Sequence, residues 1–228
     1  MIHNPSLFEL AGIPLPFAPL AATGLVLILA ALLALLVRLA YRRHDGVLPR
    51  GGLSLIAALE YLLESLSGFI HSILGKHTAD FERFLIGIFF FILLSNLLGL
   101  IPGLLAPTTD FAINLAMAVT VFIYYHYVGI RHHGLHYLKV FLGPVWWLAF
   151  LMLPIEVVSH FARILSLSMR LTGNMTGEHA VMGMFAAMLP IGPTAIFLFL
   201  GLLTAVLQAF VFMTLSTIYI LLSIEIEH

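Results

Sequence analysis

Two arginines lie inside a long apolar stretch of this chain. Arg163 and Arg170 are seven residues apart within residues 140–189, so they fall on one face of a helix. A guanidinium keeps its charge in proteins, and at the centre of a membrane it costs about 2.5–3.5 kcal/mol on insertion scales. A charge placed at that cost predicts a site that handles ions or charged groups.

A stripe of polar and small residues surrounds the two arginines. Its members recur at intervals of three and four residues, with one adjacent pair, and large apolar residues fill most of the remaining helix surface. The stripe consists of Glu156, Ser159, Arg163, Ser166, Arg170, Gly173, Asn174 and Gly177. The competing interpretation is an amphipathic core helix with a solvated or internally paired face. The apolar flanks favour a stripe that faces something other than lipid.

The composition indicates a membrane protein with several spans. Of 228 residues, 61% are hydrophobic and 9% are charged, a balance typical of polytopic membrane proteins. The net charge of −1 leaves no basic patch for phosphates and excludes nucleic acid as a partner. The absence of cysteine excludes disulfides and thiolate metal sites.

The sequence carries no recognisable enzymatic motif. It has no Walker A phosphate loop and no set of nucleophile, base and orienting residue, so we expect no enzymatic activity of the chain alone and no cofactor. The histidines of residues 131–136 lack carboxylates and regular spacing, so we expect no metal site there.

Long apolar runs predict an all-helical fold, with five transmembrane helices and one interfacial amphipathic helix in a single membrane domain over residues 1–228. The transmembrane helices are expected over residues 18–43, 83–105, 110–130, 144–190 and 194–224. Residues 52–75 mix Glu60, Glu64 and His71 with large apolar side chains, which suits a helix lying at the membrane surface. Asp110 is expected to cap the helix that follows it.

The basic residues predict how the chain is oriented in the membrane. The first seventeen residues lack the basic region of a cleavable signal peptide, so the first span is expected to be retained. Eight of the ten basic residues lie at the end of the first span, between there and the start of the second, or after the third. They are Arg38, Arg42, Arg43, Arg50, Lys76, Arg83, Arg131 and Lys139. By the positive-inside rule, the N-terminus faces outward and the C-terminus faces the cytoplasm.

The last two predicted helices are longer than a bilayer is thick. Residues 155–189 contain no proline, so an unbroken helix would run about 52 Å against a hydrocarbon core of about 30 Å. Such a helix must tilt by roughly 55° from the membrane normal, and the turn at residues 190–193 predicts a hairpin of two steeply tilted helices. The alternative is that the Gly-Asn-Met-Thr-Gly string at residues 173–177 breaks the first of them in two.

Several strings resemble subunit a of the rotary, F-type ATP synthase. The most specific is Ser-Leu-Ser-Met-Arg-Leu-Thr-Gly-Asn-Met at residues 166–175, and others lie at residues 96–102, 154–159 and 208–213. The resemblance covers roughly residues 80–223. In that family the last two helices lie nearly along the membrane and curve round a ring of c subunits, so the resemblance implies the same hairpin here.

The resemblance implies a proton-conducting stator subunit. Protons would reach a carboxylate on each c subunit through one half-channel and leave through a second, offset half-channel, while Arg170 separates the two and drives deprotonation. Asn174 and Gln208 would assist Arg170, although an amide that bonds a neighbouring helix is the alternative for Gln208. Gly173 and Gly177 would let the ring approach closely, because small residues bring membrane helices together.

Glu156 and Ser159 match the inner exit path of the family. Arg163 shares their face, and we expect it to have a structural role, either pairing with Glu156 or reaching lipid headgroups.

In the family, an ionisable residue nine positions after the arginine works with a second ionisable residue on the final helix, seven positions before the glutamine. On the outer side this chain departs from that pattern. The first position is His179, preceded by Glu178, whereas the second is Gly201. We expect Glu178 and His179 together to serve the outer half-channel. Candidate helpers are Asn96, Asn114, Asp110 and His126, for which hydrogen bonding between helices is the competing role.

The resemblance also implies partners and a location. The partners are the oligomeric c-ring, the b subunits of the peripheral stalk, the lipid bilayer and, indirectly, a soluble ATPase head, all at the inner membrane of a bacterial cell. Selectivity between H⁺ and Na⁺ is expected to depend on the ring's own ligands. The alternative function is a secondary transporter with a substrate site near the membrane midplane, a class expected to show an inverted repeat that this sequence lacks.

Overall fold

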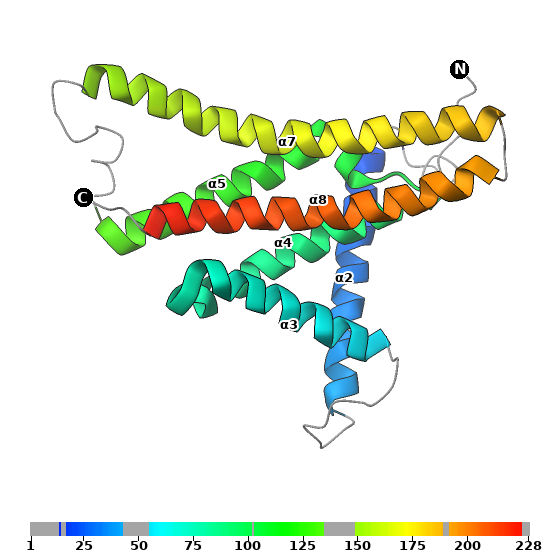
Figure 1. Cartoon of the computed structure of the whole chain (residues 1–228), viewed down its shortest axis with the longest axis horizontal. Helices are drawn as coiled ribbons and strands as arrows, with labels where there is room; N and C mark the ends of the chain where they lie inside the picture. The colour runs from blue at the N-terminus through cyan, green and yellow to red at the C-terminus, as the bar shows by residue number, and fades with distance from the viewer. Residues whose placement is uncertain are drawn as a thin grey trace. The chain divides into compact units, whose positions relative to one another are not determined.

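The computed structural model describes residues 14, 17–42, 55–101, 103–134, 149–188 and 192–224. Every regular element in these ranges is helical, which confirms the predicted all-helical fold (Figure 1). Five stretches are long and apolar enough to cross a membrane, namely residues 18–36, 57–99, 111–133, 150–185 and 196–224. The chain is therefore a multi-pass membrane protein, as its composition indicated.

The helices follow the apolar runs of the sequence. They are α2 (Ala18–Arg42), α3 (Leu55–Leu74), α4 (Thr78–Gly99), α5 (Phe111–His133), α7 (Ala149–Met188) and α8 (Gly192–Ile224). A short 3₁₀ turn, η2 (Gly75–His77), joins α3 to α4, and another, η3 (Pro107–Thr109), precedes α5. The helix expected at the membrane surface is α3, and its interfacial position stays a prediction.

Helix α7 is continuous. It contains 40 residues and passes through residues 173–177 without interruption, so the alternative of two shorter helices is wrong. At 1.5 Å per residue it is about 60 Å long. Helix α8 contains 33 residues, which confirms that the last two helices are long. Residues 189–191 of the predicted turn between them lie outside the described residues.

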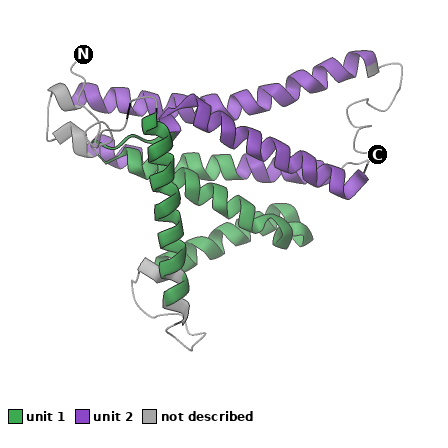
Figure 2. Ribbon diagram, turned by 180° about the vertical axis from the view of Figure 1, so that it is seen from behind, with its two compact units in different colours: residues 1–107, 202–213 green, residues 108–201, 214–228 purple. Residues whose placement is uncertain are grey.

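Helix contacts divide the chain into two units (Figure 2). Unit 1 comprises Met1–Pro107 and Leu202–Met213, and unit 2 comprises Thr108–Gly201 and Thr214–His228. Within unit 1, α2 and α3 both pack against α4. Their packing buries apolar side chains, including Ala22, Val26 and Leu98, because each helix presents at least one continuous apolar strip.

Unit 2 is built on an antiparallel pair of helices, α5 and α7. Asn114 near the start of α5 contacts Thr172, whereas His126, further along α5, contacts His160. Later residues of α5 thus contact earlier residues of α7, so the two helices run in opposite directions. Asp110 begins α5 as predicted, since its Oδ1 accepts a hydrogen bond of 2.7 Å from the main-chain N–H of Ala112.

The buried face of α8 carries many small and polar side chains. These are Gly201, Ala205, Gln208, Ala209, Ser216, Thr217 and Ser223. The exposed side chains of the same helix include Leu202, Leu203, Val206, Leu207 and Leu222. This distribution is typical of membrane helices, in which small residues permit close helix packing and large apolar residues face lipid.

Candidate functional site

The polar stripe of α7 has a partly buried half and an exposed half. Glu156, Ser159 and Arg163 are half-buried, whereas the later members are exposed, namely Ser166, Arg170, Gly173, Asn174 and Gly177. The opposite face of the helix is buried and contains His160, Leu167, Ser168, Leu171 and Met175. The exposed half of the stripe therefore points away from the packing of α7 within this chain.

Arg170 lies in the middle of the exposed half. Among the described residues, it makes no hydrogen bond, ion pair or ring contact. Exposed apolar side chains such as Phe161, Leu165 and Met169 cover a different part of the helix surface and suit contact with lipid. The helix thus has one face for lipid and a separate polar face that carries a permanent positive charge.

Gly173 and Gly177 leave room beside Arg170. A Cβ atom built on either glycine would meet no heavy atom within 4 Å, apart from its immediate chain surroundings. Both residues adopt ordinary helical backbone conformations, because the positive φ angles of the described glycines occur elsewhere. The packing of this chain therefore does not require small residues at these two positions. A close approach by another molecule would require them.

Asn114 joins α5 to α7 from a buried position. Its Nδ2 donates to the main-chain oxygen of Thr108 at 2.7 Å and to Oγ1 of Thr172 at 2.8 Å. The Thr172 hydroxyl in turn donates to the main-chain oxygen of Ser168 at 3.0 Å. Asn114 Oδ1 is buried without a hydrogen-bond partner among the described residues. The hydrogen bond to Thr172 holds α5 against α7, and the bond to Thr108 holds the turn that precedes α5. The side-chain oxygen of Asn114 can still accept a hydrogen bond.

Asn96 and Gln208 are buried in unit 1. The Nδ2 of Asn96 on α4 lies 3.5 Å from the main-chain oxygen of Ala205 on α8, a long and therefore weak hydrogen bond. Gln208 lies on the small and polar face of α8 described above. Gln208 thus lies on the face of α8 on which small residues gather, and Asn96 contacts that face from α4.

Glu178 and His179 directly follow Gly177 on α7. Both residues are half-buried, yet both carboxylate oxygens of Glu178 and the Nε2 of His179 are buried without a hydrogen-bond partner among the described residues. A buried polar group without a partner costs roughly 1–3 kcal/mol, and more if it is charged. These two side chains are therefore candidates for a site that water or another molecule completes.

A histidine–aromatic cluster lies near the start of the stripe and consists of Phe122, Tyr125, His126 and His160. The ring centroids of His126 and His160 are 5.0 Å apart, and those of Phe122 and His126 are 4.2 Å apart. His160 Nδ1 lies 3.3 Å from Oε1 and 2.8 Å from the main-chain oxygen of Glu156. Glu156 therefore has a titratable partner on its own helix.

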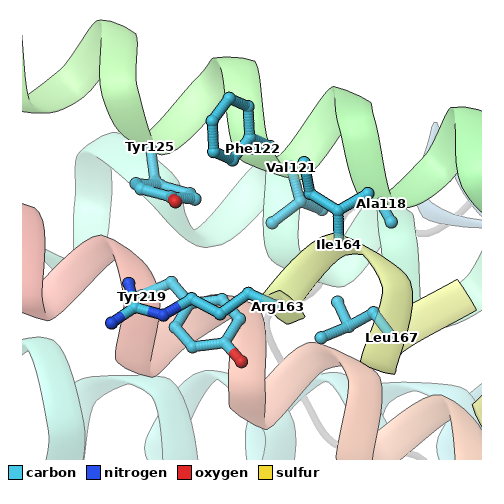
Figure 3. Close-up of a pocket in the computed structure, with 8 residues that line it drawn as sticks. All are labelled: Ala118, Val121, Phe122, Tyr125, Arg163, Ile164, Leu167 and Tyr219. Carbon is cyan, nitrogen blue, oxygen red and sulfur yellow. The ribbon is translucent and has the colours of Figure 1, made fainter. Parts of the chain in front are cut away.

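Arg163 contacts Tyr219 instead of Glu156. Its guanidinium carbon lies 5.2 Å from the centre of the Tyr219 ring (Figure 3), within the range of a cation–π interaction. The two residues line a small pocket together with Ala118, Val121, Phe122, Tyr125, Ile164 and Leu167. The ion pair expected between Arg163 and Glu156 is not formed in the described part of the chain.

Sequence reasoning missed two residues of this region. His160 carries a recognisable signal, because it follows Glu156 by four residues and therefore lies on the same helix face. Tyr219 carries none, because it belongs to a different helix and its neighbours are apolar or uncharged.

Comparison with known proteins shows the family of the chain. The family described as ATP synthase A chain matches residues 23–221. ATP synthase subunit a of Trichlorobacter lovleyi is 44% identical over 170 residues, which cover 75% of this chain and 74% of the relative. ATP synthase subunit a of Bdellovibrio bacteriovorus is 36% identical over 219 residues, covering 95% and 96%.

The fold and the matched region define a polytopic helical subunit of a membrane complex. The chain belongs to the ATP synthase A chain family, which confirms the resemblance inferred from its motifs. The match leaves no support for the alternative of a secondary transporter.

Proposed function

We propose that this chain is the proton-conducting stator subunit of an F-type ATP synthase. It forms two offset half-channels that pass protons to and from carboxylates on an oligomeric c-ring, and Arg170 separates the channels and drives deprotonation. The chain alone is not an enzyme, because the chemistry of ATP belongs to the soluble head of the complex. The observation that carries this proposal is the exposed Arg170 on an otherwise largely apolar helix.

The group that faces Arg170 determines what its charge costs in the membrane. Contact with lipid would cost about 2.5–3.5 kcal/mol on insertion scales, whereas a carboxylate on a neighbouring subunit would offset that cost. A cation within about 4–6 Å favours the ionised form of a carboxyl group by roughly 10- to 1000-fold. Each ring carboxylate would therefore release its proton as it passes Arg170. Open space beside Gly173 and Gly177 supports the close approach that this exchange needs.

The proton paths use the side chains on either side of Arg170. Glu178 and His179 serve the outer half-channel, and Glu156 and Ser159 serve the inner one. The amides of Asn174 and Gln208 assist at the arginine, and Arg163 has a structural role. Asn96, Asn114 and Asp110, whose side chains also make hydrogen bonds to the main chain, assist the outer path.

The same proposal places the chain in the inner membrane of a bacterial cell. The N-terminus faces outward, the C-terminus faces the cytoplasm, and residues 1–228 form one membrane domain. Helix α3 lies at the interface. Helices α7 and α8 tilt steeply, because their lengths of about 60 Å and about 50 Å must fit a core of about 30 Å. The partners are the c-ring, the b subunits, the lipid bilayer and, through them, the ATPase head.

The test is removal of the charge at position 170. Arg170→Ala should abolish both ATP-driven proton pumping in inverted vesicles and proton-driven ATP synthesis, while the subunit still co-purifies with the c-ring and the ATPase. Arg170→Lys should not restore full function, because lysine lacks the planar guanidinium and can lose its proton when buried. The matched control is Arg131→Ala, which removes an exposed arginine at the end of α5. Normal pumping by an assembled Arg170→Ala complex would refute the proposal.

A further inference from the structure

Two side chains of α7 could hold the carboxylate of Glu156. His160 does so, with Nδ1 at 3.3 Å from Oε1. Arg163 is two helical turns away from Glu156, about 10.5 Å along the axis, which long side chains extended toward each other can span. Its guanidinium lies instead over the ring of Tyr219, as Figure 3 shows.

The choice between these partners decides whether Glu156 can carry a proton. Arginine is permanently charged, and a guanidinium close to Glu156 would favour its ionised form by roughly 10- to 1000-fold. Histidine can gain and lose a proton near neutral pH. One proton of the pair can lie on Oε1 of Glu156, or on Nδ1 of His160, where the main-chain oxygen of Glu156 at 2.8 Å also accepts it. Neither state has a net charge, so the proton can move between the two atoms without leaving an uncompensated charge in the membrane.

We propose that Tyr219 is a positioning residue of the inner half-channel, whose ring holds the guanidinium of Arg163 and thereby leaves Glu156 to His160. This inference rests on the proposed function, in which Glu156 lines the inner path. The neighbouring titratable groups are His126 and Tyr125, whose ring centroids lie 5.0 Å and 6.2 Å from that of His160. Neither carries a permanent charge, so Arg163 is the permanent cation that must be held away.

The first test removes the ring that holds Arg163. Tyr219→Leu should slow ATP-driven proton pumping in inverted vesicles by about tenfold or more, because the freed guanidinium would keep Glu156 ionised. Tyr219→Phe should pump at the native rate, since a cation–π contact needs the ring and not the hydroxyl group. The matched control is Tyr127→Leu, which removes an exposed tyrosine on α5. If Tyr219→Leu lowers the amount of subunit in the membrane, Tyr219→Met carries the same expectation, because its longer and more flexible side chain can fill the irregular space that the ring leaves.

The decisive test is a double variant. In Tyr219→Leu with Arg163→Gln no cation remains to hold Glu156, so pumping should recover to the rate of Arg163→Gln alone, which we expect to be modestly below native. If the Tyr219 ring merely packs between helices, pumping by the double variant should not recover. The inference is overturned if Tyr219→Leu pumps at the native rate or if the double variant stays as slow as Tyr219→Leu. Arg170→Ala in the same vesicles separates the two ideas, because pumping by that variant would refute the proposed function whatever happens at Tyr219.

Discussion

A bulky side chain at Gly173 should stabilise the subunit and inactivate the complex. Gly173 is in the interior of α7, and a Cβ atom there meets nothing within 4 Å in this chain. Glycine costs a helix interior about 0.8–1.0 kcal/mol relative to alanine, and leucine costs little. Gly173→Leu should therefore raise the free energy of unfolding of the isolated subunit by somewhat less than 1 kcal/mol.

The same change should block the exposed face. Gly173 lies about 60° around the helix from Arg170, so the leucine side chain would stand where a partner helix must approach. Small residues allow close packing of membrane helices, and a residue of this size would hold Arg170 away from a carboxylate on the partner. We expect ATP-driven pumping to fall at least about tenfold, because the effect of a cation on a carboxyl group declines beyond about 4–6 Å.

Gly183 provides the matched control on the same helix. A Cβ at this position also meets nothing within 4 Å, yet the residue lies about 140° around an ideal helix from Arg170. Gly183→Leu should give the same gain in stability without loss of pumping. The measurements are thermal unfolding of the subunit purified in detergent, where 1 kcal/mol corresponds to about 2–4 °C for a chain of this size, and pumping in inverted vesicles.

The result at position 173 separates two explanations. A leucine that lowers both stability and pumping would mean that Gly173 is packed within the chain. Native pumping by Gly173→Leu would mean that no partner approaches this face, and the reasoning from the exposed stripe would be refuted.

Two further predictions concern buried polar groups. Glu178→Gln and His179→Ala should each partially slow proton translocation in inverted vesicles, and the double variant should slow it far more. Adding Gly201→Glu to the double variant should recover part of that loss. A double variant that pumps at the native rate would place the outer half-channel elsewhere. Asn114→Ala removes the hydrogen bond to Thr172 and should lower the free energy of unfolding by between about 0.6 kcal/mol, the average for interhelical hydrogen bonds in a membrane protein, and about 1.7 kcal/mol, the largest such value. Thermal unfolding in detergent checks this, and an unchanged midpoint would show that the bond contributes nothing.

Local features of the sequence were sufficient to predict the helices and part of the candidate site. Apolar runs predicted the helices, because the side chains of each run must lie in protein or in lipid whichever helices pack beside them. Asp110 was recognisable as a cap because a cap bonds to the main chain within its own turn. The stripe that contains Arg170 followed from the period of a single helix. Motif resemblance then supplied the family, which the comparisons confirmed.

The continuity of α7 depended on more than propensity. The glycines at residues 173 and 177 made a break conceivable, since each weakens a helix by about 1 kcal/mol. A break inside a membrane would leave main-chain N–H and C=O groups without partners, at several kcal/mol for each group. That larger cost decides in favour of one long helix.

The sequence by itself determined which residues share a face of one helix, because the helical period fixes that relation locally. Only the tertiary structure decided which partner each polar side chain meets. Arg163 and Glu156 share a face and have opposite charges, so pairing was the natural expectation. The packing of unit 2 instead brings Tyr219, from another helix, under the guanidinium. Contacts between helices depend on how whole surfaces fit together, and no local period encodes that fit.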